Sequence, residues 1–271
     1  MPTVTEKVLI LTKTYPNPSA KYQETVCVAG ITEAGEMKRI YPVPFRRLQG
    51  DQRFSRWQWV TANFSTPRDD HRPDSWRVDA DSIKLGTTID TRNGWRERLT
   101  WIAPHILPSF EAMEAQRIKT KKTLGCLRVS RLIGLDVTPR PAKESEWSHE
   151  EETNLAQDLM QPGLFDTDGG RKPPMLEKIP YMFHYRYEAG GTEHRHLITD
   201  WEASQLYRNC FRMYGNGWET QFRAKLETEF AGKDLHFLMG TVHRFPDQWL
   251  IIGLIYPPKP TMNTAQPALD L

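Results

Sequence analysis

The stretch Arg39–Trp59, RIYPVPFRRLQGDQRFSRWQW, dominates the interpretation of this 271-residue chain. It ends one predicted strand and begins another, and between them it interleaves five arginines with five aromatic residues and a single acid, Asp51. Guanidinium groups pair with phosphate as a fork, and flat rings offer bases a surface for stacking. The stretch therefore predicts a nucleic-acid surface, single-stranded in preference, on a strand-rich domain.

The alternative is that the rings belong to a hydrophobic core and the arginines to its solvated rim. On the nucleic-acid interpretation, the binding residues in this stretch are Arg39, Tyr41, Phe45, Arg46, Arg47, Arg53, Arg56, Trp57 and Trp59.

Working outward, short apolar strands punctuated by glycine and proline flank the stretch on both sides. The predicted strands are Lys7–Thr12, Thr25–Ile31, Met37–Tyr41, Trp57–Phe64 and Arg77–Leu85. Residues 95–116 change to helical spacing, which Pro104 and Pro108 interrupt. Strands return at Leu124, so residues 1–138 are predicted to form an OB-like β-barrel region, either one barrel or two small ones.

Positive charge is concentrated in this N-terminal region. Residues 1–138 carry 22 Lys and Arg against 15 Asp and Glu, whereas residues 139–180 carry 5 against 9. A second basic cluster, Lys119, Lys121 and Lys122, lies within it. Charge runs are usually solvated faces, but these lysines would line a groove for a phosphate backbone if they lay beside Arg39–Trp59.

Residues 139–178 read as an acidic, proline-rich linker with a short helix near residues 150–160. The segment QPGLF, with Gln161, Leu164 and Phe165, has the Gln-x-x-Leu-Phe form that bacterial sliding clamps bind in partner proteins. This predicts a partner-binding site; alternatively Leu164 and Phe165 pin the linker to its own protein.

Residues 179–260 are predicted to form an α+β domain, followed by a tail at 261–271. The sequence Thr199-Asp-Trp-Glu202 fits a capping box, in which the threonine hydroxyl accepts the first free N–H groups of a helix. A hairpin of two apolar strands ends the domain. The overall fold class is therefore mixed β and α+β.

His194, His196 and Asp200 form the densest potential metal cluster. Two histidines one residue apart on a strand share a face, so both could bind one cation and support a metal-dependent nuclease. The alternative is a capped helix and two surface histidines, which the capping pattern favours. No metal or other cofactor is therefore predicted.

Fingerprints of serine hydrolases, phosphate-binding loops and dinucleotide sites are absent from the sequence. Three widely spaced cysteines argue against a disulfide framework. Neither a signal peptide nor a membrane-spanning run is recognisable, which predicts a cytoplasmic protein that makes no membrane contact.

Two segments, ETVCVAGITEAGEMKRIYPVPFR and KTLGCLRVSRLIGLDVTP, resemble the dual-OB-type proteins of prokaryotic conflict and defence gene clusters. In that family a Leu-Gly strand, here Leu124-Gly125, opens the second barrel, and cysteines precede the helix that begins at Asp-Trp-Glu. The corresponding turn here, EAGGTEHRH, has no cysteine. The resemblance implies a binding role in anti-phage or DNA-maintenance machinery.

The sequence thus predicts a non-catalytic nucleic-acid-binding accessory protein of a bacterial defence or DNA-processing assembly. Its expected partners are nucleic acid and the proteins of a defence or replication complex. Two alternatives stay open: a metal-dependent nuclease built on the histidine cluster, and a protein–protein adaptor that uses the linker motif.

Overall fold

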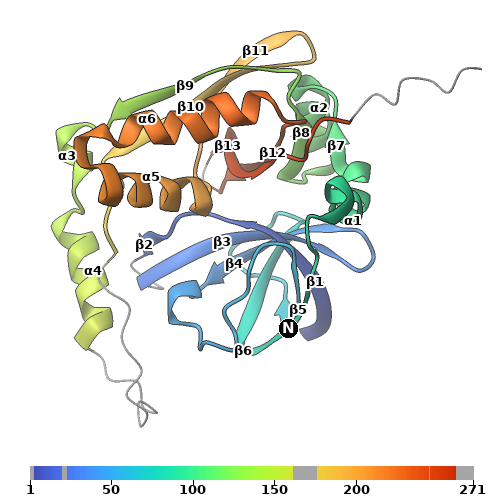
Figure 1. Cartoon of the computed structure of the whole chain (residues 1–271). Coiled ribbons are helices and arrows are strands. Elements are labelled where there is room, and N and C mark those ends of the chain that lie inside the picture. The colour runs from blue at the N-terminus through green and yellow to red at the C-terminus, as the bar shows by residue number, and fades with distance from the viewer. Residues whose placement is uncertain (1–2, 20–22, 161–175, 244, 261–271) are drawn as a thin grey trace, which may run out of the picture.

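Five N-terminal strands close into a β-barrel in the computed structural model, which describes residues 3–19, 23–160, 176–243 and 245–260 (Figure 1). The barrel strands are β1 (Thr3–Lys13), β3 (Gln23–Thr32), β4 (Met37–Val43), β5 (Gln58–Ser65) and β6 (Ser75–Thr88). The order around the barrel is β1-β3-β4-β6-β5, and β1 closes it by pairing with both β3 and β5. The pair β4–β6 is parallel, and the other barrel pairs are antiparallel.

Alternation along the strands fills the barrel, because successive side chains of a strand point to opposite faces. Val60, Ala62 and Phe64 of β5 are buried, and they pack with Val8 and Val26 from neighbouring strands. The predicted barrel is therefore confirmed, and each of its five strands overlaps a strand predicted from the sequence.

The C-terminal part consists of two sheets covered by helices, and most of their strand pairs are antiparallel. One sheet has the order β11-β10-β9 and the other has the order β13-β12-β8-β7. Their strands are β7 (Ile106–Leu107), β8 (Leu124–Arg128), β9 (Arg131–Pro139), β10 (Tyr181–Ala189), β11 (Thr192–Leu197), β12 (His236–Val242) and β13 (Phe245–Ile255). The predicted mixture of β-barrel and α+β parts is therefore confirmed.

Helices α5 (Trp201–Tyr214) and α6 (Trp218–Arg223) pack side by side over these sheets (Figure 1). Tyr207 of α5 and Phe222 of α6 contact Phe183 of β10, with ring centroids 5.7 and 4.6 Å apart. A π-helical turn, η4 (Ala224–Glu229), continues α6.

The domain boundary predicted at residue 138 lies too late in the chain. Strand β8 pairs with β12, and β9 pairs with β10, so both belong to the C-terminal sheets. Leu124-Gly125 therefore does not open a second barrel. Because β8 is apolar on both faces, it has to be covered on both, and it lies between β12 and the short strand β7 in the C-terminal sheet.

The helices between the two parts follow the proline pattern. Helix α1 (Arg92–Ile102) ends before Pro104, and α2 (Phe110–Thr120) begins after Pro108. In the predicted linker, α3 (Ala142–Ser145) precedes α4 (His149–Met160), which matches the short helix expected there. Among the described residues, no helix has the length and apolar character needed to cross a membrane.

The barrel and the C-terminal sheets share one hydrophobic core. Leu9 and Trp57 of the barrel region pack in the same cluster as Leu238 and Ile252 from β12 and β13. Backbone and side-chain hydrogen bonds also cross the junction: the Tyr15 N–H donates to the Thr199 carbonyl at 2.8 Å. The two parts therefore form one folded unit.

Candidate nucleic-acid interface

The tryptophans of the Arg39–Trp59 stretch lie in the core. Trp57 and Trp59 are 2% and 7% exposed, and their rings meet Trp95 and Trp101 edge-on. Phe45 packs between Phe54 and Trp201. Trp57 and Trp59 cannot stack on a base in the folded protein, so their assignment to binding is corrected: for them the core alternative holds. Phe45 is half-buried, and its assignment stays a prediction.

Most arginines of the stretch make contacts within the protein. Arg46 forms an ion pair with Glu24 at 2.8 Å. Arg53 donates to the carbonyls of Leu48 and Arg46, at 2.9 Å in each case. The side chain of Arg47 is exposed. An arginine that already has a carboxylate partner releases fewer counterions on meeting phosphate, so the stretch is less cationic than its composition indicates.

Arg56 joins the barrel to the C-terminal part. Its guanidinium donates to the carbonyls of Leu11 and Leu254, at 2.8 and 2.7 Å, and forms an ion pair with Glu202. The side chain is 8% exposed. Arg56 is therefore a structural residue, and its assignment to nucleic-acid binding is also corrected.

Arg39 and Tyr41 line a hollow of about 460 Å³ between the barrel and the β12–β13 hairpin. We call it the junction pocket. Its barrel wall comes from β3, β4, β6 and the β5–β6 loop, and its other wall from the C-terminal sheet. The lining residues include Thr14, Cys27, Arg39, Tyr41, Asp70 and Ile252.

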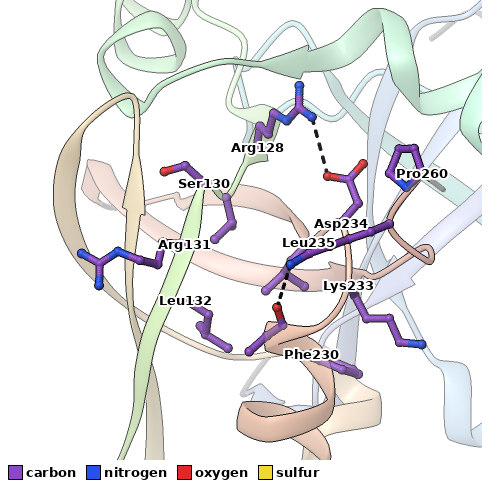
Figure 2. A pocket seen from close by; sticks show the side chains of 12 residues that line it. Arg128, Ser130, Arg131, Leu132, Phe230, Lys233, Asp234, Leu235 and Pro260 are labelled. Atoms are coloured by element: carbon purple, nitrogen blue, oxygen red, sulfur yellow. Dashed lines mark hydrogen bonds and ion pairs between the residues drawn. The ribbon is translucent and has the colours of Figure 1, made fainter. Parts of the chain in front are cut away.

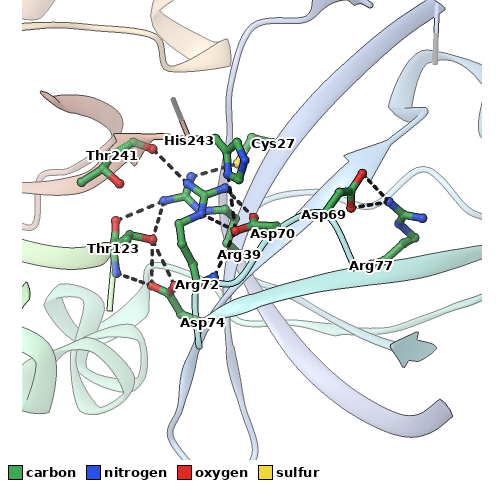
Figure 3. A network of polar contacts seen from close by, with 10 residues as sticks. All are labelled: Cys27, Arg39, Asp69, Asp70, Arg72, Asp74, Arg77, Thr123, Thr241 and His243. Carbon is green, nitrogen blue, oxygen red and sulfur yellow. Dashed lines mark hydrogen bonds and ion pairs between the residues drawn. The ribbon is translucent and has the colours of Figure 1, made fainter. Parts of the chain in front are cut away.

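A polar network, seen in Figure 3, holds Arg39 in place. Its Nη2 donates to the backbone carbonyl and the hydroxyl of Thr123, at 3.1 and 3.2 Å, and its Nη1 donates to Cys27 Sγ at 3.4 Å. The carboxylate of Asp74 in turn accepts from the Thr123 N–H at 2.6 Å. Arg39 is 4% exposed, so it shapes the wall of the pocket more than it offers a free charge.

Ion pairs balance the charges at the mouth of the junction pocket. Arg72 donates two hydrogen bonds to Asp70, at 2.8 and 2.6 Å, and Arg77 donates to Asp69 at 3.0 Å (Figure 3). Burial favours the neutral form of Asp70, but the hydrogen bonds from Arg72 outweigh it and hold the pKa of this carboxyl well below its usual range. Asp70 is therefore an anion at any physiological pH.

The lysine cluster lies next to this network in the chain. Lys119, Lys121 and Lys122 are exposed at the end of α2, directly before the Thr123 that binds Arg39. A hydrogen bond from Lys38 chiefly lowers the pKa of Glu36, and the charge of Lys122 adds to the effect, which places Lys122 near the start of β4. The structure therefore brings this cluster beside one end of the predicted stretch.

A second hollow, of about 530 Å³, lies at the opposite end of β12 (Figure 2). Its lining has an apolar part, with Leu132, Phe230 and Leu235, and a polar rim. Four cations, Arg128, Arg131, Lys233 and Lys259, stand in that lining with one carboxylate, Asp234. Sequence reasoning missed this basic rim because its members lie more than a hundred residues apart and meet only through the sheet pairing.

The metal cluster considered as an alternative, His194, His196 and Asp200, is not assembled. His194 and His196 lie on β11 against the ring of Phe110, at centroid distances of 4.9 and 5.0 Å. Burial lowers the pKa of His196 to about 4, and its Nδ1 is 2.9 Å from the Tyr187 hydroxyl. Among the described residues, no group of three or more His, Cys, Asp or Glu side chains has the arrangement to hold a metal ion.

Asp200 is instead the N-cap of α5. One carboxylate oxygen accepts from the Ala203 N–H at 2.8 Å, and the other accepts from the Thr12 hydroxyl at 3.1 Å. The predicted cap at Thr199 is thus one residue too early, since the Thr199 hydroxyl donates to the Ile251 carbonyl. Burial raises the pKa of Asp200 to about 6, against the attraction of Arg56.

The clamp-like motif, with Gln161, Leu164 and Phe165, lies outside the described residues. It therefore stays a prediction from sequence.

Two family models match the chain, and their boundary agrees with the strand pairing. Residues 4–104 match "Domain of unknown function (DUF8758)", which covers the barrel and α1. Residues 107–270 match "Domain of unknown function (DUF8757)", which begins at β7. No curated protein matches the chain. Because the second match covers more than half of the 271 residues, the chain belongs to the DUF8757 family, with a DUF8758 domain before it.

Proposed function

We propose that this protein binds single-stranded nucleic acid without catalysis, as an accessory subunit of a cytoplasmic bacterial defence or DNA-processing assembly. The observation that carries the proposal is the junction pocket, which opens on the barrel face formed by β3 and β4 and is lined by the exposed ring of Tyr41.

The topology of the barrel supports this proposal. In a five-stranded OB-fold, the face of the second and third strands and the loops after the first and fourth strands bind oligonucleotides. Counted along the chain, β3 and β4 are the second and third strands of the barrel, and the segment between β5 and β6 is the loop after the fourth. The barrel wall of the junction pocket comes from these elements: Cys27 lies on β3, Tyr41 lies on β4, and Pro67 lies in the β5–β6 loop.

Phosphate contacts are expected from the exposed cations rather than from the paired arginines. The lysines at 119, 121 and 122 lie beside the β4 end of the barrel face, and the basic rim with Lys233 and Lys259 offers a second place for a backbone. Each phosphate contact on a single strand contributes about 0.7 to the slope of log affinity against log salt. A slope of about 2 is thus expected if the three lysines carry the contacts.

The alternatives have less support. A nuclease needs two or more metal ligands in one place, and His194 and Asp200 serve separate structural contacts. An adaptor role would rest on the motif at residues 161–165, where the structure offers no observation.

The test is fluorescence anisotropy of the full-length protein with labelled single-stranded DNA and RNA at several salt concentrations. We expect the logarithm of the affinity to fall linearly with the logarithm of the salt concentration. Absence of binding to either nucleic acid at low salt would overturn the proposal. Cleavage of the probe only when a divalent metal is added would favour the nuclease instead.

A further inference from the structure

We infer that the junction pocket receives an unstacked base of the nucleic acid, and that the phosphates of the strand stay outside it. This inference rests on the proposed function and goes beyond it, because it assigns the base and the backbone to different parts of the surface. Three properties of the pocket carry it: its charges, its exposed ring and its apolar side chains.

The charges of the pocket discourage a phosphate. The guanidinium groups of Arg72 and Arg77 lie against Asp70 and Asp69, and the side chains of Arg72 and Asp70 are only 14% and 13% exposed. A phosphate that approached these arginines would meet two carboxylates at the same place, and like charges repel each other. The third arginine of the lining, Arg39, is 4% exposed and already donates to Thr123, so the pocket offers an anion little free positive charge.

The ring that the pocket offers is Tyr41. It is 38% exposed, in contrast to the buried tryptophans of the same stretch. Its hydroxyl accepts a hydrogen bond from the Thr25 hydroxyl at 3.2 Å, which restrains the orientation of the ring. A ring held in place at the wall of a hollow is a ready stacking partner for a base, and such stacking is sequence-tolerant because every base has a π-face.

The lining also contains apolar side chains, which come from both parts of the molecule and stand among threonines. Pro67 stands on the barrel side, and Val242, Leu250 and Ile252 stand on the hairpin side. A hollow of about 460 Å³ lies within the range of small-ligand pockets. An extruded base that entered the pocket would therefore lose contact with water. Its edges would contact apolar side chains, and one of its faces would stack on the ring of Tyr41.

The experiment compares a short single-stranded oligonucleotide with an abasic oligonucleotide of the same length and backbone charge. The full-length protein should bind the abasic strand roughly 5- to 150-fold more weakly, which corresponds to the stacking of one base. The salt dependence of the two strands should be the same, because their phosphates are identical.

The variants Tyr41→Ala and Tyr41→Phe locate the effect. With Tyr41→Ala the difference between the two strands should largely disappear, whereas Tyr41→Phe keeps the ring and should keep the difference. Tyr214→Ala is the matched control, because Tyr214 is 48% exposed and does not line the pocket. Thermal melts would verify that each variant is folded.

The possible failures differ from one another. Equal affinity for the two strands would overturn the base assignment and leave nucleic-acid binding standing. A loss of salt slope in Tyr41→Ala would also overturn it, since the pocket would then hold a phosphate. No binding of the intact strand at low salt would overturn the proposed function itself, and the base assignment with it.

Discussion

At the scale of single residues, exposure separates the aromatic side chains of one stretch into two roles. Trp57 and Trp59 are buried, whereas Tyr41 stands at the wall of the junction pocket. Burial of a tryptophan contributes several kcal/mol to folding, and a ring at the surface contributes far less. The two kinds of position should therefore respond differently to truncation.

We predict that Trp57→Ala lowers the free energy of unfolding by about 3–5 kcal/mol. The ring is 2% exposed and packs against Trp95, so its removal leaves a cavity in the shared core. Tyr41→Ala, as the control, should cost about 1 kcal/mol or less. Chemical denaturation, monitored by the circular dichroism of the backbone, measures the free energy of unfolding of both variants. Equal stability losses in the two variants would contradict the assignment of Trp57 to the core.

Asp200 allows a second prediction, which separates the cap from the charge. Asp200→Ala removes the acceptor for the Ala203 N–H and should cost about 1 kcal/mol. Asp200→Asn keeps an acceptor there, and its amide can donate to the Thr12 hydroxyl, whose single proton is then free for the Ile252 carbonyl 2.8 Å away. Asparagine should therefore retain most of the stability that alanine loses.

The charge of Asp200 should also appear in the pH dependence of stability. Its folded pKa of about 6 exceeds the unfolded value of about 3.9. The stabilisation linked to its proton is present below about pH 4 and is lost as the pH rises through 6. In Asp200→Asn this part of the pH dependence should vanish. Thermal melts of the parent and the variant from pH 4 to 7 measure it, and identical profiles would refute the raised pKa.

At the scale of elements, the barrel strands could be predicted as short apolar segments bounded by glycine and proline. Strand β5 alternates between inward and outward residues, whereas β1 ends in a continuous buried run. The helices α1 and α2 could be placed because Pro104 and Pro108 limit them. Strand β8 does not alternate, because it is covered on both faces, and its longer partner, β12, lies more than a hundred residues further along the chain. Local pattern therefore located the strand and assigned it to the wrong sheet.

The candidate site shows the same limit. Arg39 and Tyr41 could be found from composition, since both belong to the arginine- and aromatic-rich stretch. The sequence could not show which arginines are already paired, because the partner of Arg56 is Glu202, far along the chain. The hairpin wall of the junction pocket, with Leu250 and Ile252, carries no motif at all. It becomes visible only when the two parts of the chain are brought together.

Lys119, Lys121 and Lys122, at the end of α2, allow a prediction about which part of the protein contacts phosphate. If the three lysines contact phosphate, their joint replacement by alanine should lower the slope of log affinity against log salt by about 2. Arg46→Ala is the informative comparison, because Arg46 is already paired with Glu24. It should change the slope little and reduce stability instead, since the buried carboxylate of Glu24 loses its partner. Anisotropy titrations at several salt concentrations, with thermal melts of each variant, decide between them.

At the scale of the whole molecule, the barrel and the C-terminal sheets depend on close packing across their junction. A Cβ atom at Gly253 of β13 would stand 2.7 Å from Thr12 Cβ of β1, too close for unshifted backbones. We predict that Gly253→Ala destabilises the protein by about 1–3 kcal/mol, as overpacking does. Gly50→Ala, which meets no atom within 4 Å, should change stability by less than about 0.5 kcal/mol. Comparable melting temperatures for the two variants would show that the junction yields easily.

The last prediction concerns the two family models, which divide the chain at residues 104–107 although the hydrophobic core crosses that point. Leu9 and Leu11 of β1 pack with Leu238 and Ile252, so a fragment of residues 1–105 would expose their outer faces to water. Exposed apolar patches of this kind lead to unfolding or association. We therefore expect the isolated barrel fragment to be unfolded or aggregated, and the full chain to unfold in a single calorimetric transition.

Mixing the barrel fragment with a fragment of residues 106–271 is the control for this experiment. Recovery of the native circular dichroism spectrum on mixing would show that the missing surface, rather than the cut itself, prevents folding. A barrel fragment that melts cooperatively on its own would contradict the prediction. In that case the junction would join two stable domains, and the junction pocket between them could open and close as they move.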